Sequence, residues 1–168
     1  MKSVRNQTFL LILAVAVLSM CTREQDGMEL SDVSPEESME VMYDSTLAAE
    51  LGADDYGMRR YVMAFLKSGP NRPENPDEAA RLQRAHLDNI SRLAEEGSLV
   101  VAGPFLDDTE IRGIYIFAVE SVEEARALSE SDPAIQAGSL ELELHPWYGS
   151  AALMQIGEIH SSISRESP

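Results

Sequence analysis

Two residues far apart in the sequence, His86 and Asp132, have the side-chain types needed for proton transfer. His86 lies four residues after Leu82 and four before Ile90, so it shares their face of a predicted helix. A carboxylate that hydrogen-bonds one ring nitrogen fixes the tautomer of an imidazole and leaves the other nitrogen basic. The pair therefore predicts general base catalysis. Each residue also has a structural interpretation, His86 as a core histidine satisfied by a backbone carbonyl and Asp132 as a helix cap before Pro133.

Three further residues are candidates for binding the substrate. Asn71 and Arg72 belong to the loop Gly69-Pro70-Asn71-Arg72, which we expect to shape a pocket. Arg72 or Arg81 is suited to meet an anionic group of a small molecule, because an arginine guanidinium matches the geometry of a carboxylate. These assignments predict a small-molecule ligand with some negative charge.

Other kinds of site have little support in the sequence. No serine lies in a G-x-S-x-G motif, and no two histidines have the spacing of metal ligands. Gly69 and Gly103 lack the pattern of a dinucleotide or phosphate loop. We therefore expect neither a metal nor a cofactor.

The candidate residues need helices and strands to bring them together. Asn75, Pro76 and Glu78 predict the start of a helix that runs to Glu96 and ends at Gly97. Ser121 and Glu124 form a second capping box, which opens a helix that ends before Asp132. Apolar or alternating segments predict four strands, at 61–66, 99–102, 111–119 and 140–144.

This order of elements is that of the ferredoxin-like fold. The arrangement βαββαβ predicts an α+β domain over residues 58–149, with an antiparallel sheet covered on one face by two helices. Because the two helices lie side by side, a contact between His86 and the segment after the second helix is geometrically allowed. The uncovered face should carry four residues of the last strand, and a large aromatic there favours a homodimer through this face. These residues are Glu141, Glu143, His145 and Trp147.

The first 21 residues are typical of a bacterial export signal. Lys2 and Arg5 precede an apolar run over 9–18 that is shorter than the roughly 20 residues needed to span a bilayer. Leu18-Ser19-Met20-Cys21 resembles a lipobox, although a small residue is usual where Met20 stands. Cys21 is the only cysteine, and we expect it to be lipidated; an ordinary signal peptide is the alternative. The chain is then a lipoprotein of the cell envelope that faces the periplasm.

Charge and composition describe the segments on either side of the predicted domain. The formal net charge is −16, and residues 22–57 contain eleven acidic residues and one basic residue. Such a stretch repels itself and buries little, so a flexible tether is expected there. The tail over 150–168 contains a possible short helix at 151–159. Nucleic acid is not an expected partner, because no basic stripe is available to neutralise phosphates.

Three stretches of the sequence together resemble the YCII-related domain family. They are Arg84-Ala85-His86-Leu87, Glu96 to Pro104 and Asp132 to Gly138, and the similarity extends over about residues 60–148. The resemblance implies a dimeric α/β barrel in which open sheet faces of two protomers pack together. It also implies a histidine–aspartate dyad at His86 and Asp132, and relatives that include a dehydrochlorinase. The export signal, the tether and the tail depart from the family pattern.

Two hypotheses for the function follow. In the first, His86 abstracts a proton from a small organic substrate while Asp132 orients the ring, in a lyase or isomerase that needs no cofactor. In the second, the same cavity holds a ligand without catalysis, as a binding or sensing module tethered in the cell envelope. A purely structural dimer is a third possibility.

Overall fold

The structure is a computed structural model, and it describes residues 42–166. The predicted signal sequence, Cys21 and the tether up to residue 41 lie outside the described residues. Within the described range no helix is both long enough and apolar enough to cross a membrane.

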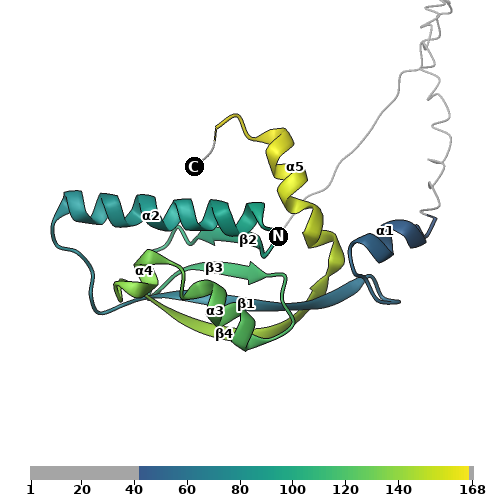
Figure 1. The fold of residues 1–168 in the computed structure, drawn as a ribbon, viewed down its shortest axis with the longest axis horizontal. Helices are drawn as coiled ribbons and strands as arrows, with labels where there is room; N and C mark the ends of the chain where they lie inside the picture. The colour runs from purple at the N-terminus through teal and green to yellow at the C-terminus, as the bar shows by residue number, and fades with distance from the viewer. Residues whose placement is uncertain (1–41, 167–168) are drawn as a thin grey trace, which may run out of the picture. The chain divides into compact units, whose positions relative to one another are not determined.

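A single antiparallel sheet organises the described chain (Figure 1). Its strand order is β2-β3-β1-β4, which is the order of the ferredoxin-like fold, and all three strand pairs are antiparallel. The predicted fold class is therefore confirmed. The strands are β1 (Met58–Ser68), β2 (Leu99–Pro104), β3 (Ile111–Phe117) and β4 (Leu140–Ser150).

The helices begin at the residues that the capping signals predicted. Asn75 accepts hydrogen bonds from two backbone N–H groups at the start of α2 (Pro76–Glu95). Ser121 and Glu124 form the capping box of α3 (Val122–Ser129). Gly97 follows α2 with a φ of 73°, a conformation that favours glycine. The short α4 (Pro133–Gln136) begins directly after Asp132.

Three strands, β1, β2 and β4, are longer than the sequence pattern predicted, and β3 ends two residues earlier, at Phe117. β1 lies between two neighbours and pairs with β4 along all of its eleven residues, so its polar ends are held in the ladder. β4 continues through Pro146, because it is an edge strand and an edge position needs no backbone donor on its outer side. Pairing with a central strand thus extended β1 and β4 beyond their apolar segments.

One face of the sheet forms the core with the helices. Alternate residues of β1 and β3 point to this face and pack with apolar residues of α2 and α3. Leu142 and Leu144 of β4 also pack there, and Glu141 and Glu143 point to the opposite face, as their alternation predicted. Pairing of two protomers through that opposite face stays a prediction. The core residues include Val62, Ala64, Leu66, Leu93, Tyr115, Phe117 and Ala125.

The chain on both sides of the predicted domain contains helices. Residues 45–50 form α1 (Ser45–Glu50), where a flexible tether was expected, because Asp44 caps the helix and Arg59 donates to the carbonyl of Leu51. After β4 come the 3₁₀ helix η1 (Ala151–Gln155) and α5 (Ile156–Ile163). The tail therefore holds two short helices, and its α-helical part lies after residue 155.

Candidate functional site

His86 and Asp132 meet beneath the helical layer. His86 Nδ1 lies 2.8 Å from Asp132 Oδ2, although 46 residues separate them in the sequence. α2 carries the histidine, and the turn between α3 and α4 carries the aspartate. Asp132 is 0% exposed and His86 is 8% exposed, so the imidazole is the part of the pair nearest to solvent.

Asp132 uses both carboxylate oxygens, as its position before Pro133 suggested. Oδ1 accepts the backbone N–H of Ala134 at 2.8 Å and caps α4, while Oδ2 contacts His86. The cap and the dyad are therefore compatible, since each uses a different oxygen. Because α4 holds the carboxylate on one side, Asp132 can fix the orientation of the imidazole ring.

Tyr115 of β3 is a third member of this cluster that the sequence did not predict. Its hydroxyl donates to Asp132 Oδ2 at 3.2 Å and lies 3.5 Å from His86 Nε2. The side chain is 1% exposed. Burial, and next the negative charge of Asp132, raise the pKa of the Tyr115 phenol far above its ordinary value, so it stays protonated at any physiological pH.

Next to the dyad, the side chains of Asn89 and Arg92 on α2 form a hydrogen-bonded group with Ser131. Arg92 donates to Asn89 Oδ1 at 2.8 Å and to the Ser131 hydroxyl at 2.9 Å. Ser131 precedes Asp132, so these hydrogen bonds tie the turn before the aspartate to the helix of the histidine. Asn89 Nδ2 is buried and has no partner among the described residues. These hydrogen bonds hold the helix that carries His86 and the turn that carries Asp132 in a fixed relative position.

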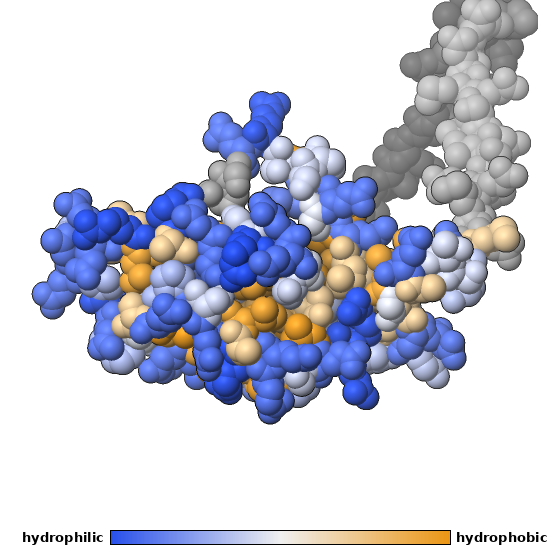
Figure 2. All heavy atoms as spheres, viewed as in Figure 1, coloured by the Kyte–Doolittle hydropathy of each residue, from blue (hydrophilic) through white to orange (hydrophobic). Residues whose placement is uncertain are grey.

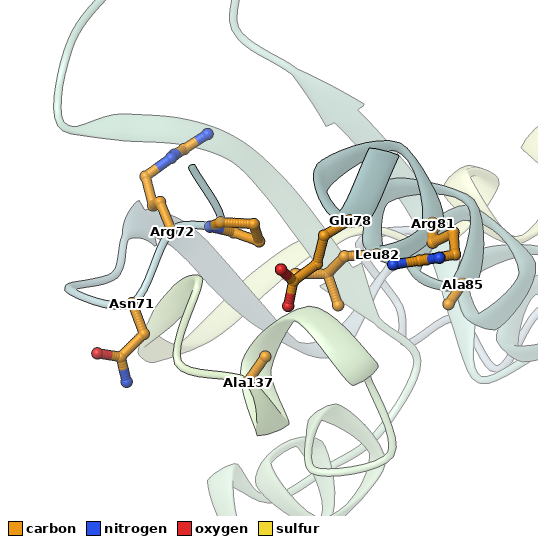
Figure 3. A pocket seen from close by; sticks show the side chains of 8 residues that line it. Asn71, Arg72, Glu78, Arg81, Leu82, Ala85 and Ala137 are labelled. Carbon is orange, nitrogen blue, oxygen red and sulfur yellow. The ribbon is translucent and has the colours of Figure 1, made fainter. Parts of the chain in front are cut away.

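An open cavity of about 630 Å³ lies one helical turn from His86. All three substrate-binding candidates line it, as Figure 3 shows. Glu78 of α2, which the sequence pattern indicated only as a capping residue, also points into it. The lining residues are Asn71, Arg72, Pro73, Glu78, Arg81, Leu82, Ala85 and Ala137.

The loop after β1 is held against the turn after α4, which places Asn71 at the cavity. The N–H of Asn71 donates to the Gly138 carbonyl at 3.0 Å, and the N–H of Gly69 donates to the Ser139 carbonyl at 2.9 Å. A Cβ atom at Gly69 would lie 2.2 Å from the Gly138 oxygen, so this close approach requires glycine. The backbone therefore fixes one wall of the cavity.

The dyad adjoins this cavity but is not part of its lining. Leu82 and Ala85 line it, and they lie one turn and one residue before His86 on the same helix. A second cavity of about 350 Å³ is lined by Ala134, whose N–H is bonded to Asp132. Figure 2 shows polar residues over most of the helical side, with apolar residues gathered between α2 and α3. The predicted site residues thus form two neighbouring groups.

The described residues contain no group of three or more histidine, cysteine, aspartate or glutamate side chains able to hold a metal ion. His145, the second described histidine in a carboxylate contact, lies 2.9 Å from Glu143 on the opposite face of the sheet. It is half-exposed and belongs to a surface network.

The fold and the buried pair define an α+β protein with a histidine–carboxylate dyad under its helices. Residues 62–148 match the model of the YCII-related domain, and the chain belongs to that family. It is 37% identical over 62 residues to the uncharacterized protein YjpA of Bacillus subtilis, a match that covers 37% of this chain and 71% of the relative.

One solved structure that resembles this chain is an enzyme with a bound quinone. It is the 5-chloro-2-hydroxyhydroquinone dehydrochlorinase of Burkholderia phenoliruptrix, in complex with 2,5-dihydroxybenzoquinone. The two sequences are 22% identical, and the TM-score is 0.40 over 53% of this chain and 93% of that chain.

Proposed function

We propose that this YCII-related domain protein catalyses a cofactor-independent proton transfer on a small organic substrate, as a lyase or an isomerase. The observation that carries this proposal is the 2.8 Å contact between His86 Nδ1 and an Asp132 carboxylate that is 0% exposed. A histidine on the surface is solvated by water and does not need a buried carboxylate as its partner. A buried pair costs desolvation energy, and a role in proton transfer is a reason to retain it.

In the proposed mechanism His86 is the base and Asp132 is the orienting group. The Nδ1–H donates to Asp132 Oδ2, so the lone pair is on Nε2. Nε2 takes a proton from a carbon next to a carbonyl group, and the electron pair of the broken C–H bond forms an enolate. In an isomerase the proton returns to another carbon; in a lyase the electron pair expels a leaving group. Asp132 keeps the ring in place as the acceptor of Nδ1–H and stabilises the imidazolium.

The neighbouring cavity is the proposed binding place for the rest of the substrate. Arg72 and Arg81 line it, and neither forms an ion pair within the described part of the chain. Three other arginines, Arg84, Arg92 and Arg112, are each paired with a carboxylate four residues away. An unpaired arginine at a cavity favours an anionic ligand such as a small carboxylate or phenolate.

Exchange of substrate C–H groups for deuterium tests this proposal without knowledge of the product. The full chain is incubated in D₂O with a panel of small keto acids, hydroxy acids and phenols, and exchange is followed by NMR. We expect exchange with at least one compound and a loss of about 100-fold or more in His86→Gln, because general base catalysis contributes about that much. His145→Gln is the matched control, and its rate should equal that of the wild type. Equal rates in both variants would contradict the proposal.

A binding or sensing module is the second candidate, and the separation of cavity and dyad favours it. Because His86 does not line the cavity, a ligand held there need not touch the imidazole. In that case a compound from the panel would raise the melting temperature of wild type and His86→Gln equally, without deuterium exchange. Arg81→Gln would remove the stabilisation.

A further inference from the structure

We propose that the Ser139 hydroxyl binds the keto or hydroxy oxygen of a small carboxylate whose anionic group is held by Arg72. This inference deepens the proposed function and rests on it, because it names the class of the substrate and a second place where the substrate is recognised. The observation behind it is a buried serine that lines a cavity and whose hydroxyl has no hydrogen-bond partner within the described residues.

This serine lines the second cavity, of about 350 Å³. Such a volume lies at the lower end of the range for small-molecule sites. Arg72, Pro73 and Leu82 line both cavities, so the two cavities adjoin. The second cavity also reaches Ala134, whose N–H donates to Asp132 Oδ1. A ligand in this cavity therefore lies next to the segment that holds the carboxylate of the dyad.

The backbone of Ser139 is satisfied, but its hydroxyl is not. Its N–H donates to the Ala134 carbonyl and its carbonyl accepts the Gly69 N–H, both at 2.9 Å. The residue is 8% exposed, and its hydroxyl has no partner among the described residues. In this part of the chain the unpartnered side-chain atom that is fully enclosed is Asn89 Nδ2, so the Ser139 hydroxyl is not enclosed and opens on the cavity.

A second buried serine shows what the fold supplies when a hydroxyl has a structural role. Ser129 is 1% exposed, and its hydroxyl donates to the Ala125 carbonyl at 2.7 Å. A buried hydroxyl without such a partner makes the folded state less stable than an alanine would. Ser139 therefore carries a hydroxyl that the fold does not use, and a ligand oxygen can supply the missing partner.

Arg72 determines the charge of the ligand. It is the charged residue among those that line the second cavity. Its guanidinium donates to the Ser68 hydroxyl at 3.3 Å and forms no ion pair within the described part of the chain. Glu78 lines the first cavity but not the second, so no carboxylate of the described lining repels an anion beside Ser139. A carboxylate is the expected group, because it matches the fork of a guanidinium.

The apolar part of the second cavity limits the rest of the ligand. Ala79, Leu82, Ala134 and Leu140 line it and suit the carbon skeleton that joins the two polar ends. A sugar phosphate would place further hydroxyl groups against these side chains without partners, at a cost in free energy. A fatty acid would leave the Ser139 hydroxyl unpaired. The cavity therefore favours a small acid with one further oxygen.

The test is a comparison of matched ligands by isothermal titration calorimetry with the full chain. Each pair differs by one oxygen: levulinate against pentanoate, and para-hydroxybenzoate against benzoate. We expect the wild type to bind the oxygen-bearing member of at least one pair about threefold to tenfold more tightly, which is the usual effect of one hydrogen bond. Equal affinities within both pairs, or no binding of either pair, would mean that water alone occupies the space beside Ser139 and would overturn the proposal.

Two serine variants separate ligand binding from a structural role. Ser139→Ala should abolish the preference within a pair, whereas Ser129→Ala, the matched control, should keep it. Without ligand, Ser139→Ala should melt at the temperature of the wild type or higher, because the lost hydroxyl had no partner, and Ser129→Ala should melt lower. A preference that survives in Ser139→Ala overturns the proposal, and so does a lower melting temperature of that variant.

Two arginine variants test the place of the anionic group. Arg72→Gln should weaken the binding of both members of a pair by about tenfold or more, because both carry the same carboxylate. Arg112→Gln is the control, since Arg112 is paired with Asp108 and lines neither cavity. Equal affinities of the two variants would overturn the role of Arg72.

These binding measurements are independent of the deuterium exchange assay. If the ligand preference is found but no exchange occurs, the role of Ser139 stands and the proposed enzymatic function fails. If exchange occurs without the preference, the enzymatic function stands and the role of Ser139 is overturned.

Discussion

Two histidine–carboxylate pairs of nearly equal length lie on opposite faces of one sheet. His86 Nδ1 is 2.8 Å from Asp132 Oδ2 on the helical face, and His145 Nε2 is 2.9 Å from Glu143 Oε1 on the other face. The side chains of the first pair are 10% and 1% exposed, whereas those of the second are 50% and 47% exposed. Geometry alone does not distinguish them, but burial does.

The surroundings of the two pairs explain why only one is a candidate for catalysis. Glu143 also contacts Lys67 at 2.7 Å, and Lys67 first and His145 second lower the pKa of its carboxyl group. Water screens that network, and either partner can leave it at little cost. Asp132 has protein donors on both oxygens and no contact with solvent, so His86 has one fixed partner and one fixed orientation. A histidine that acts as a base needs the fixed partner and orientation that Asp132 gives to His86.

Removal of the buried carboxylate should have the largest effect on stability. Asp132→Ala leaves His86 and Tyr115 without their shared acceptor and removes the cap of α4, and we expect a loss of about 3–5 kcal/mol in the free energy of unfolding. Glu143→Ala should change it very little, since its side chain is half-exposed. Urea unfolding of both variants measures the difference.

The variant Asp132→Asn keeps this comparison testable if Asp132→Ala does not fold. Its side-chain oxygen can still cap α4, so it should be less destabilised than the alanine variant. A cost for Glu143→Ala equal to that for Asp132→Asn would show that burial does not separate the two pairs.

The sequence predicted the elements around the buried pair well because their signals are local. Asn75 and Ser121 cap helices within three residues of themselves, and the alternation of Leu142 and Glu143 assigns them to opposite faces of β4. The position of Asp132 before Pro133 predicted the α4 cap in the same way. Contact with His86 needed only the side-by-side packing of two helices, which the fold class implies.

The contact of Tyr115 with the dyad, and the separation of the cavity from the dyad, were not predictable, because both depend on long-range pairing. Tyr115 lies in a run of apolar and aromatic residues, and its face was decided by the register in which it pairs with Ala64 of β1. A shift of one residue would have placed it on the other side of the sheet. Likewise the Tyr148 hydroxyl donates to Asp54, which is 94 residues away in the sequence. No local pattern predicts such pairings.

Acidification should remove the stability that the exposed pair contributes, and this effect should be smaller than that of removing Asp132. The folded protein lowers the pKa of Glu143 below its ordinary value of 4.5, so its stabilising contribution is present above the unfolded value and lost as the pH falls through the folded value. The difference in stability between wild type and Glu143→Gln, present near neutral pH, should therefore vanish in acid. Denaturation series at several pH values measure it. A difference that grows as the pH falls would contradict this assignment.

The smallest expected effect is the response of the two faces to salt. The Debye length falls from about 10 Å at 0.1 M to about 3 Å at 1 M, so salt screens the exposed contact of Glu143 with Lys67. The stability difference between wild type and Lys67→Gln should shrink across this range, whereas that between wild type and Asp132→Asn should stay constant, because Asp132 has no contact with solvent. Equal shrinkage of both differences would mean that water and ions reach the buried pair, and His86 would then lack the fixed partner that its proposed role as a base requires.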